Sequence, residues 1–267
     1  MPSADKRARQ KENARAARLQ REAEEKRRKR RRSTIIFGVG GALIVGLFVI
    51  ASIAGTDKKD ATSTTSTTTA VAYPAGCVKT VPDDPAPKTD QTAPPMTIDA
   101  SKTYTATFST SCGEFTATLD AKNSPKGVNN FVFLARQGFY DGLTWHRVVD
   151  DFVIQGGDPN ADGTGGPGYT VVTELPKDGY PLGTLAWAKG DGEPAGSAGS
   201  QFFVVTGKST EALSQKVGGE YQYGAFGKVT SGLANAEKIM SLAPVAEGGD
   251  GAPTLPMYIF KVTIDES

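Results

Sequence analysis

Residues 145–168 read WHRVVDDFVIQGGDPNADGTGGPG, and this stretch is the most informative part of the chain. It places Arg147, Phe152 and Gln155 within nine residues, directly before a glycine-rich run. Glycine adopts backbone conformations that other residues avoid, so the chain is able to bend sharply here. A second apolar segment, QFFVV, follows at residues 201–205. The two segments together hold most of the candidate site residues.

The charge of the chain is divided unevenly along its length. Of 267 residues, the first 33 hold 14 basic and five acidic side chains, a net charge of +9, and the remainder has a net charge of −8. An acidic body repels phosphate, so we expect no nucleic-acid partner for it. The single histidine, His146, disfavours a His-rich metal site, and the two cysteines, Cys77 and Cys112, are too few for a zinc site and too far apart for a CxxC redox pair. No metal or cofactor is expected.

An apolar segment follows the basic head, residues 1–33. Ser52 is the only polar side chain among residues 35–55. These 21 residues are enough for a membrane-spanning helix. We therefore predict a transmembrane anchor at 34–55. Its positive flank lies on the N-terminal side, which predicts a cytoplasmic N-terminus, anionic lipid beside the head, and the rest of the chain outside a cell membrane. A cleaved signal peptide is the alternative, because Ser52-Ile53-Ala54 resembles a cleavage site.

Residues 56–96 are rich in serine, threonine and proline. Such a composition does not bury a core and predicts an extended linker between the anchor and a domain at 97–267. If the domain lies outside the membrane, Cys77 and Cys112 are candidates for a disulfide, since oxidising compartments favour one. Two free thiols are the alternative.

The hydrophobic pattern of residues 97–267 is mainly that of short strands. Alternation at 104–108 and 115–119 predicts a β-hairpin, and 258–264 predicts a last strand. Ser124-Pro125 is typical of a helix start, with Gly138 closing that helix, and a second helix is expected at about 234–242. Many strands with two helices predict a closed antiparallel β-barrel capped by two α-helices.

The segments at 145–168 and 201–205 resemble those of the cyclophilin family of peptidyl-prolyl cis-trans isomerases. Trp145-His146-Arg147 stands where that family has Phe-His-Arg, and the resemblance extends over about residues 98–267. It implies a mainly β, cyclophilin-like barrel that acts on proline-containing polypeptides without a cofactor. It also implies that Arg147 is the catalytic arginine, which donates to the prolyl nitrogen when the twisted amide loses its resonance.

The resemblance implies roles for further residues as well. Gln155 is expected to bind a substrate carbonyl or to orient Arg147, and Leu185–Gly190 is expected to pair with the substrate backbone. Two departures are notable: Val153 replaces the usual methionine, and Lys189 replaces a common asparagine. The substrate-binding residues implied in this way are Phe152, Val153, Gly163, Ala188, Lys189, Gln201, Phe203, Leu213 and Tyr223.

Other motifs and functions compete with this interpretation. Residues 158–169 begin like a calcium loop but end at Tyr169, where a bidentate glutamate is required. The glycine run at 163–168 fits a dinucleotide motif but contains Pro167 and does not open a helix. We predict an isomerase acting on extracytoplasmic proteins. The alternative from another class is a chaperone or scaffold module that binds proline segments without significant turnover.

Overall fold

The computed structural model describes residues 72–82, 91–245 and 248–267. The predicted basic head and transmembrane anchor lie outside these residues. Within the described ranges, no helix combines the length and apolar character needed to cross a membrane.

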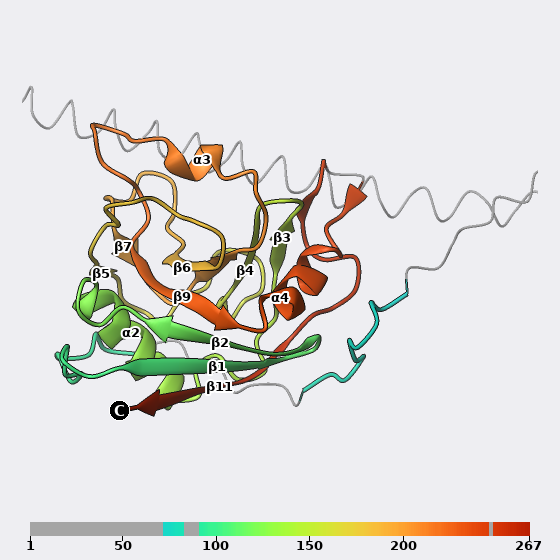
Figure 1. Cartoon of the computed structure of the whole chain (residues 1–267), viewed down its shortest axis with the longest axis horizontal. Coiled ribbons are helices and arrows are strands. Elements are labelled where there is room, and N and C mark those ends of the chain that lie inside the picture. The colour runs from blue at the N-terminus through green and yellow to red at the C-terminus, as the bar shows by residue number, and fades with distance from the viewer. Residues whose placement is uncertain (1–71, 83–90, 246–247) are drawn as a thin grey trace, which may run out of the picture. The chain divides into compact units, whose positions relative to one another are not determined.

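The described chain is mainly β-structure (Figure 1). Nine strands form one antiparallel sheet in the order β10-β3-β4-β8-β6-β9-β2-β1-β11, and β5 pairs with β7 separately. The strands are β1 (Tyr104–Thr110), β2 (Gly113–Leu119), β3 (Arg147–Val149), β4 (Val153–Gly156), β5 (Val171–Val172), β6 (Thr184–Trp187), β7 (Ser197–Ala198), β8 (Phe202–Val205), β9 (Ala225–Ser231), β10 (Asp250–Gly251) and β11 (Ile259–Glu266). The helices of the described chain are α2 (Pro125–Arg136), α3 (Glu211–Ser214) and α4 (Leu233–Met240).

The predicted hairpin at 104–119 is present as β1 and β2. Every second residue of β1 is buried, as alternation requires of a strand with one face on the core. Phe108 on β1 lies opposite Phe115 on β2, and their rings stack with centroids 4.6 Å apart. The main core encloses this pair together with Phe131 of α2 and Phe202 of β8. The hairpin therefore supplies one wall of the core.

The predicted closed barrel needs a correction. The sheet curls into a half-barrel, and its two end strands, β10 and β11, share no ladder in the part of the chain described. Instead, the segment that precedes β3 bonds to the segment that precedes β11 through backbone groups, including an isolated bridge between Thr144 and Tyr258. A register shift where β1 pairs with β11 breaks the predicted alternation at 258–264, so that Ile259 rather than Phe260 is fully buried.

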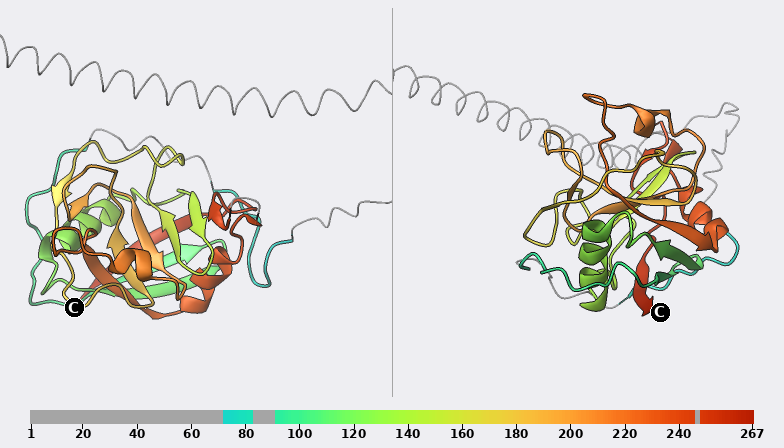
Figure 2. Two further views of the ribbon diagram at one scale, coloured as in Figure 1. Left: turned by 90° about the horizontal axis from the view of Figure 1, so that it is seen from above. Right: turned by 60° about the vertical axis from the view of Figure 1, so that its left-hand side comes forward.

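The two predicted helices are present, with changes at their ends. Ser124 occupies the N-cap position of α2 but makes no capping bond with its side chain. The carboxylate of Glu174, from a distant loop, accepts the free backbone N–H groups of Lys126 and Gly127 instead. The second helix, α4, spans Leu233–Met240 rather than 234–242. Helix α2 packs on β9 and β11 and α4 on β2 and β4, apart from each other (Figures 1 and 2).

A third helix, α3, was not predicted. This single turn lies in the loop 210–219 and buries Leu213. A four-residue helix leaves too short a periodic pattern to be detected in a sequence.

The described parts of the predicted linker are bound to the domain. Cys77 forms a disulfide with Cys112 in the β1–β2 turn, so the alternative of two free thiols does not hold in this structure. The backbone N–H of Val78 donates to the carbonyl of Ser111 at 2.7 Å, and Asn129 of α2 donates to the carbonyl of Pro95 at 3.0 Å. Residues 72–82 and 91–96 thus extend along the domain surface.

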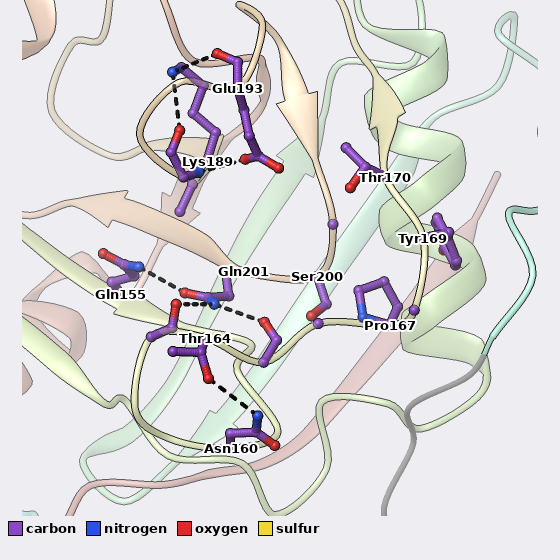
Figure 3. A pocket seen from close by; sticks show the side chains of 17 residues that line it. Gln155, Asn160, Thr164, Pro167, Tyr169, Thr170, Lys189, Glu193, Ser200 and Gln201 are labelled. Carbon is purple, nitrogen blue, oxygen red and sulfur yellow. Dashed lines mark hydrogen bonds between the residues drawn. The ribbon is translucent and has the colours of Figure 1, made fainter. Parts of the chain in front are cut away.

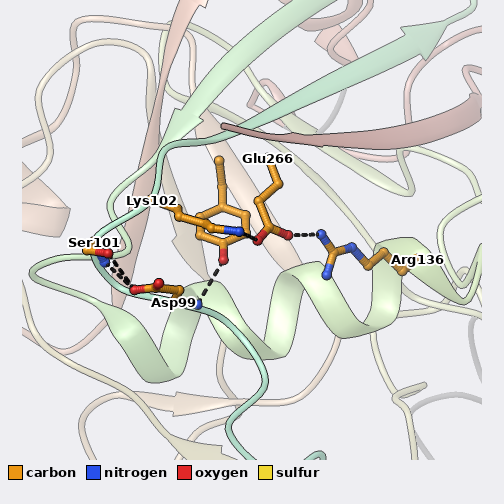
Figure 4. A network of polar contacts seen from close by, with 6 residues as sticks. Asp99, Ser101, Lys102, Arg136 and Glu266 are labelled. Carbon is orange, nitrogen blue, oxygen red and sulfur yellow. Dashed lines mark hydrogen bonds and ion pairs between the residues drawn. The ribbon is translucent and has the colours of Figure 1, made fainter.

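The C-terminal end of β11 is held by a small network of charges (Figure 4). The Glu266 carboxylate pairs with Lys102 at 2.8 Å and with Arg136, the last residue of α2, at 2.5 Å. The hydrogen bond from Lys102, followed by that from Arg136, lowers the pKa of Glu266 to about 2. The network ties the last strand to the end of α2.

Candidate active site

Strand register places the candidate site on the outer face of the sheet. Arg147 on β3 lies directly opposite Gln155 on β4, and Gln155 lies opposite Phe203 on β8. Side chains alternate between the two faces of a strand, so these three residues share one face. The neighbouring row, which includes Ile154 and Val204, points the other way and is fully buried in the main core. The same short strands therefore build both the core and the site.

A second hydrophobic cluster covers this outer face, separate from the main core. Its buried side chains include three of the predicted substrate-binding residues, Val153, Phe203 and Leu213, and we call it the outer cluster. Its buried members are Val153, Tyr180, Ala186, Phe203, Val205 and Leu213, with Phe152, Ala188 and Tyr223 among the partly buried side chains packed against it. Residues from β4, β6, β8, α3 and the segments around Tyr180 and Tyr223 thus meet on the face that carries Arg147.

The Arg147 side chain is held from two sides. Its Nε and Nη2 groups donate to the two carboxylate oxygens of Asp250, each at 2.7 Å. Its Nη1 group donates to Oε1 of Gln155 at 3.1 Å. Two roles were predicted for Gln155, binding a substrate carbonyl and orienting Arg147. This contact has the geometry that the second role requires. The guanidinium plane is fixed by acceptors at its edge and at one end.

Gln155 continues this chain of hydrogen bonds toward the glycine-rich loop (Figure 3). Its Nε2 group donates to Oε1 of Gln201 at 3.0 Å. The Nε2 group of Gln201 in turn donates to the carbonyls of Gly163 and Gly165, at 3.0 and 2.9 Å. Each amide is oriented by its partners, so the polar edge of the site is connected from Asp250 to the loop.

A cavity of about 680 Å³ adjoins this polar edge. It is lined by predicted site residues, Gln155, Gly163, Ala188, Lys189 and Gln201, together with loop residues that were not predicted, such as Glu193. The cavity and the outer cluster are neighbours, since both Gln155 and Ala188 line the cavity. Ala188 also packs against the cluster, and Gln155 lies opposite its member Phe203. The predicted substrate-binding residues therefore divide between an apolar cluster and a mainly polar cavity.

The predicted substrate-pairing segment, 185–190, needs a correction. Strand β6 lies inside the sheet between β8 and β9, so its backbone groups are already paired. The N–H of Ala188 is also used, by the carbonyl of Gln201 at 2.9 Å. At Lys189, no backbone hydrogen bond is formed with the described residues, and the side chain folds back onto the carbonyls of Gly190 and Glu193 (Figure 3). The backbone groups of Lys189, which bond to none of the described residues, therefore remain open to an added strand.

Two site residues were missed by the sequence analysis. The hydroxyl of Tyr180 donates to the carbonyl of Tyr223 at 2.7 Å and accepts the N–H of the same residue at 3.0 Å. These two bonds fix the backbone of Tyr223. The ring of Tyr223 meets the ring of Phe203 edge-on, with the ring centroids 5.5 Å apart. Asp250 is the second. Neither belongs to the segments that the resemblance singled out, and no local pattern links either to Arg147.

The surroundings of His146, next to Arg147, lower its pKa. Burial lowers the pKa of His146, an effect that the nearby Asp158 opposes and the charge of Arg147 reinforces. Its two ring nitrogens are enclosed, and the side chain of Gln201 acts against the lowering of the pKa, as Asp158 does. At neutral pH this position therefore supplies a neutral ring next to the charged Arg147.

Comparison with solved structures places this arrangement among known folds. A crystal structure of a Cryptosporidium parvum cyclophilin-type peptidyl-prolyl cis-trans isomerase, determined in the presence of the dipeptide Ala-Pro, superposes with a TM-score of 0.52 at 26% identity. The match covers 61% of this chain and 99% of that one.

Sequence comparison agrees with the structural match. A probable peptidyl-prolyl cis-trans isomerase B of Mycobacterium tuberculosis is 36% identical over 173 residues, which are 58% of this chain and 53% of that protein. The chain thus spans about half the length of that relative. A Helicobacter pylori peptidyl-prolyl cis-trans isomerase is 39% identical over 145 residues, covering 53% of this chain and 83% of that one.

The family assignment rests on the match to a whole domain. The family model for cyclophilin-type peptidyl-prolyl cis-trans isomerases matches residues 105–264, which run from β1 to β11 and include Arg147, Gln155 and the outer cluster. This chain belongs to the cyclophilin-type peptidyl-prolyl cis-trans isomerase family.

Proposed function

We propose that this protein catalyses cis-trans isomerisation of X–Pro bonds in polypeptides, with Arg147 stabilising the twisted amide. The observation that carries the proposal is the position of Arg147, which shares one sheet face with Gln155 and Phe203. A cation fixed beside an apolar cluster meets the two needs of the reaction, which are a surface for the proline ring and a donor for the amide nitrogen.

The reaction has to overcome the resonance of the amide bond, a barrier of about 18–20 kcal/mol. When the bond twists out of plane, the prolyl nitrogen gains a lone pair that the planar ground state lacks. A hydrogen-bond donor aimed at this nitrogen stabilises the transition state more than the ground state and so accelerates rotation. No covalent intermediate is required.

The donors of Arg147 suit this role. A guanidinium has five N–H groups, and Asp250 and Gln155 account for three of them here. The other two make no hydrogen bond to the residues that the structure describes and are available to a substrate. Arginine keeps its charge at all physiological pH values, so the donor is always present.

The outer cluster is our candidate for the proline-ring site. Val153, Phe203 and Leu213 present apolar surface from β4, β8 and α3, with Phe152 and Tyr223 at the margin. The adjoining cavity is our candidate for the residues before the proline, with Gly163, Ala188, Lys189 and Gln201 around it. The free backbone groups of Lys189 would pair with the substrate backbone.

We also propose that the protein is a bacterial, membrane-anchored form whose domain lies outside the cytoplasm. The apolar residues 35–55 and the basic flank before them support an anchor with a cytoplasmic N-terminus near anionic lipid. The Cys77–Cys112 disulfide supports an oxidising surrounding for the domain. The substrates would then be secreted or envelope proteins.

The activity is tested by NMR exchange spectroscopy on a short Ala-Pro peptide with the full-length chain. We expect catalytic amounts of protein to accelerate cis-trans exchange. Peptide binding by a folded protein without acceleration would overturn the proposal in favour of a chaperone or scaffold module.

The topology is tested separately, by adding a protease to intact cells that produce the chain. We expect the domain to be degraded and the basic head to be protected. A protected domain would contradict the extracytoplasmic location, and a mature protein that lacks residues 1–55 would indicate a cleaved signal peptide instead.

A further inference from the structure

We propose that Asp250 is a positioning residue of the isomerase site, which holds the Arg147 guanidinium in the orientation needed to reach the prolyl nitrogen. The inference rests on the proposed function and adds a residue that the sequence segments did not include. It starts from the paired contacts at 2.7 Å between the two carboxylate oxygens of Asp250 and the Nε and Nη2 groups of Arg147. Such paired contacts fix direction as well as distance, because both groups are planar.

The backbone places Asp250 at the right point of the sheet edge. Strand β10 pairs with β3 so that Asp250 lies opposite Val149, two residues along the strand from Arg147. Val149 and Arg147 point to the same face, so Asp250 is a diagonal cross-strand neighbour of Arg147, within reach of a long side chain. The contact thus follows from strand register.

Glycines on both sides allow this approach of the chain. Gly249 has a φ of +83°, which other residues rarely adopt, and a Cβ atom there would lie 2.8 Å from the Cβ of Asp150. The carbonyl of Gly249 accepts the N–H of Asp150 at 2.7 Å, which fixes the turn against the end of β3. The short strand β10 therefore presents one side chain, Asp250, to the site.

The contact with Asp250 determines which N–H groups of Arg147 remain for a substrate. Asp250 occupies the edge formed by Nε and Nη2, and Gln155 occupies one N–H of Nη1. The remaining N–H groups are one on Nη1 and one on Nη2. Without Asp250 the long arginine side chain would rotate, and its donors would be aimed at the substrate for only part of the time.

The contact contributes little to folding, which makes its role in catalysis testable. The side chains of Arg147 and Asp250 are 39% and 46% exposed, and ion pairs at such exposure contribute little to stability. Strand β10 is held by backbone bonds that a change of side chain leaves in place. We therefore expect Asp250 variants to fold as the wild type does.

The test compares Asp250→Asn and Asp250→Glu with Asp265→Asn in the full-length chain. Asp265 on β11 is also exposed, and its substitution changes the charge equally without touching the site. We expect Asp250→Asn to lower kcat by roughly 10- to 100-fold with little change in KM, because the outer cluster is intact. Asp250→Glu should recover part of the loss, and Asp265→Asn should match the wild type.

A double-mutant comparison shows whether Asp250 acts through Arg147. In an Arg147→Ala background, Asp250→Asn should cause no further loss of kcat. A similar loss in both backgrounds, or an unchanged kcat in Asp250→Asn alone, would overturn the assignment while leaving the proposed function in place. Absence of turnover by the folded wild-type protein would overturn both.

Discussion

Arg147 and Gln155 face each other across the β3–β4 pair, and Nη1 of the arginine donates to Oε1 of the glutamine at 3.1 Å. The amide group of the same glutamine donates to Gln201 at 3.0 Å. One side chain thus links the candidate catalytic cation to the loop that borders the cavity. Its removal should disturb turnover without removing the cation itself.

Gln155→Ala should lower kcat/KM by roughly 10-fold or more, since a hydrogen bond to a charged group contributes about 1.5–3 kcal/mol. The measurement is peptide exchange by NMR beside the wild type. Gln137→Ala is the control, because this exposed glutamine follows the last residue of α2 as its C-cap and has no part in the site. Equal rates for the two variants would show that Gln155 does not support Arg147.

Phe202 and Phe203 are adjacent in sequence but belong to opposite faces of β8. Phe202 is fully buried in the main core, and Phe203 belongs to the outer cluster. Phe202→Ala should lower the free energy of unfolding by about 3–5 kcal/mol through the cavity it creates. Phe203→Ala should lower kcat/KM by roughly 10-fold or more in protein that remains folded, because it removes apolar contact with the proline ring.

Denaturant unfolding and peptide exchange on both variants separate these effects. Full activity in folded Phe203→Ala protein would exclude this side chain from the proline-ring site.

Glu266 should give the domain an acid-dependent stability. Its pKa is lowered from 4.5 to about 2 in the folded state, first by the hydrogen bond from Lys102. A carboxylate with a lowered pKa stabilises the fold above its unfolded-state pKa, and this contribution is lost as the pH falls from about 4.5 to 2. The unfolding free energy of the Glu266→Gln variant should therefore fall less steeply than that of the wild type over that pH range. Parallel curves of unfolding free energy against pH for the two proteins would contradict this.

The Cys77–Cys112 disulfide closes a loop between residues 35 positions apart. A loop of this length restricts the unfolded chain, so replacing both cysteines by serine should cost about 2–4 kcal/mol of unfolding free energy. Cys112 lies in the main core and Cys77 packs against it, away from the outer cluster. Activity at temperatures below the transition should therefore be kept. Loss of activity in folded double-serine protein would indicate that the bridge also shapes the site.

The sequence was sufficient for the features that depend on neighbouring residues. Alternation predicted β1 and β2, and Ser124-Pro125 with Gly138 located α2. The resemblance of the segments around Arg147 and Phe203 singled out residues that strand register places on one face, and their roles in binding and catalysis stay predictions. The predictions of β1, β2 and α2 succeeded because each depends on a pattern of a few consecutive residues.

The features that were missed depend on residues far apart in the chain. Glu174 caps α2 from 48 residues away, and Asp250 contacts Arg147 from 103 residues away. The register shift beside β11 likewise arises from pairing with β1, and not from the pattern of β11 itself. No period of 2 or 3.6 residues encodes such contacts, which appear only when the sheet is assembled.

The most direct measurement is cis-trans exchange of an Ala-Pro peptide by the wild-type chain beside Arg147→Ala and Arg147→Lys. Removal of a preorganised transition-state donor lowers turnover by roughly 100-fold or more, so Arg147→Ala should be nearly inactive while it unfolds at the same temperature as the wild type. Arg147→Lys should also be poor, because a point charge does not replace the planar pair of donors. Wild-type turnover in a folded Arg147→Ala protein would contradict the role given to Arg147.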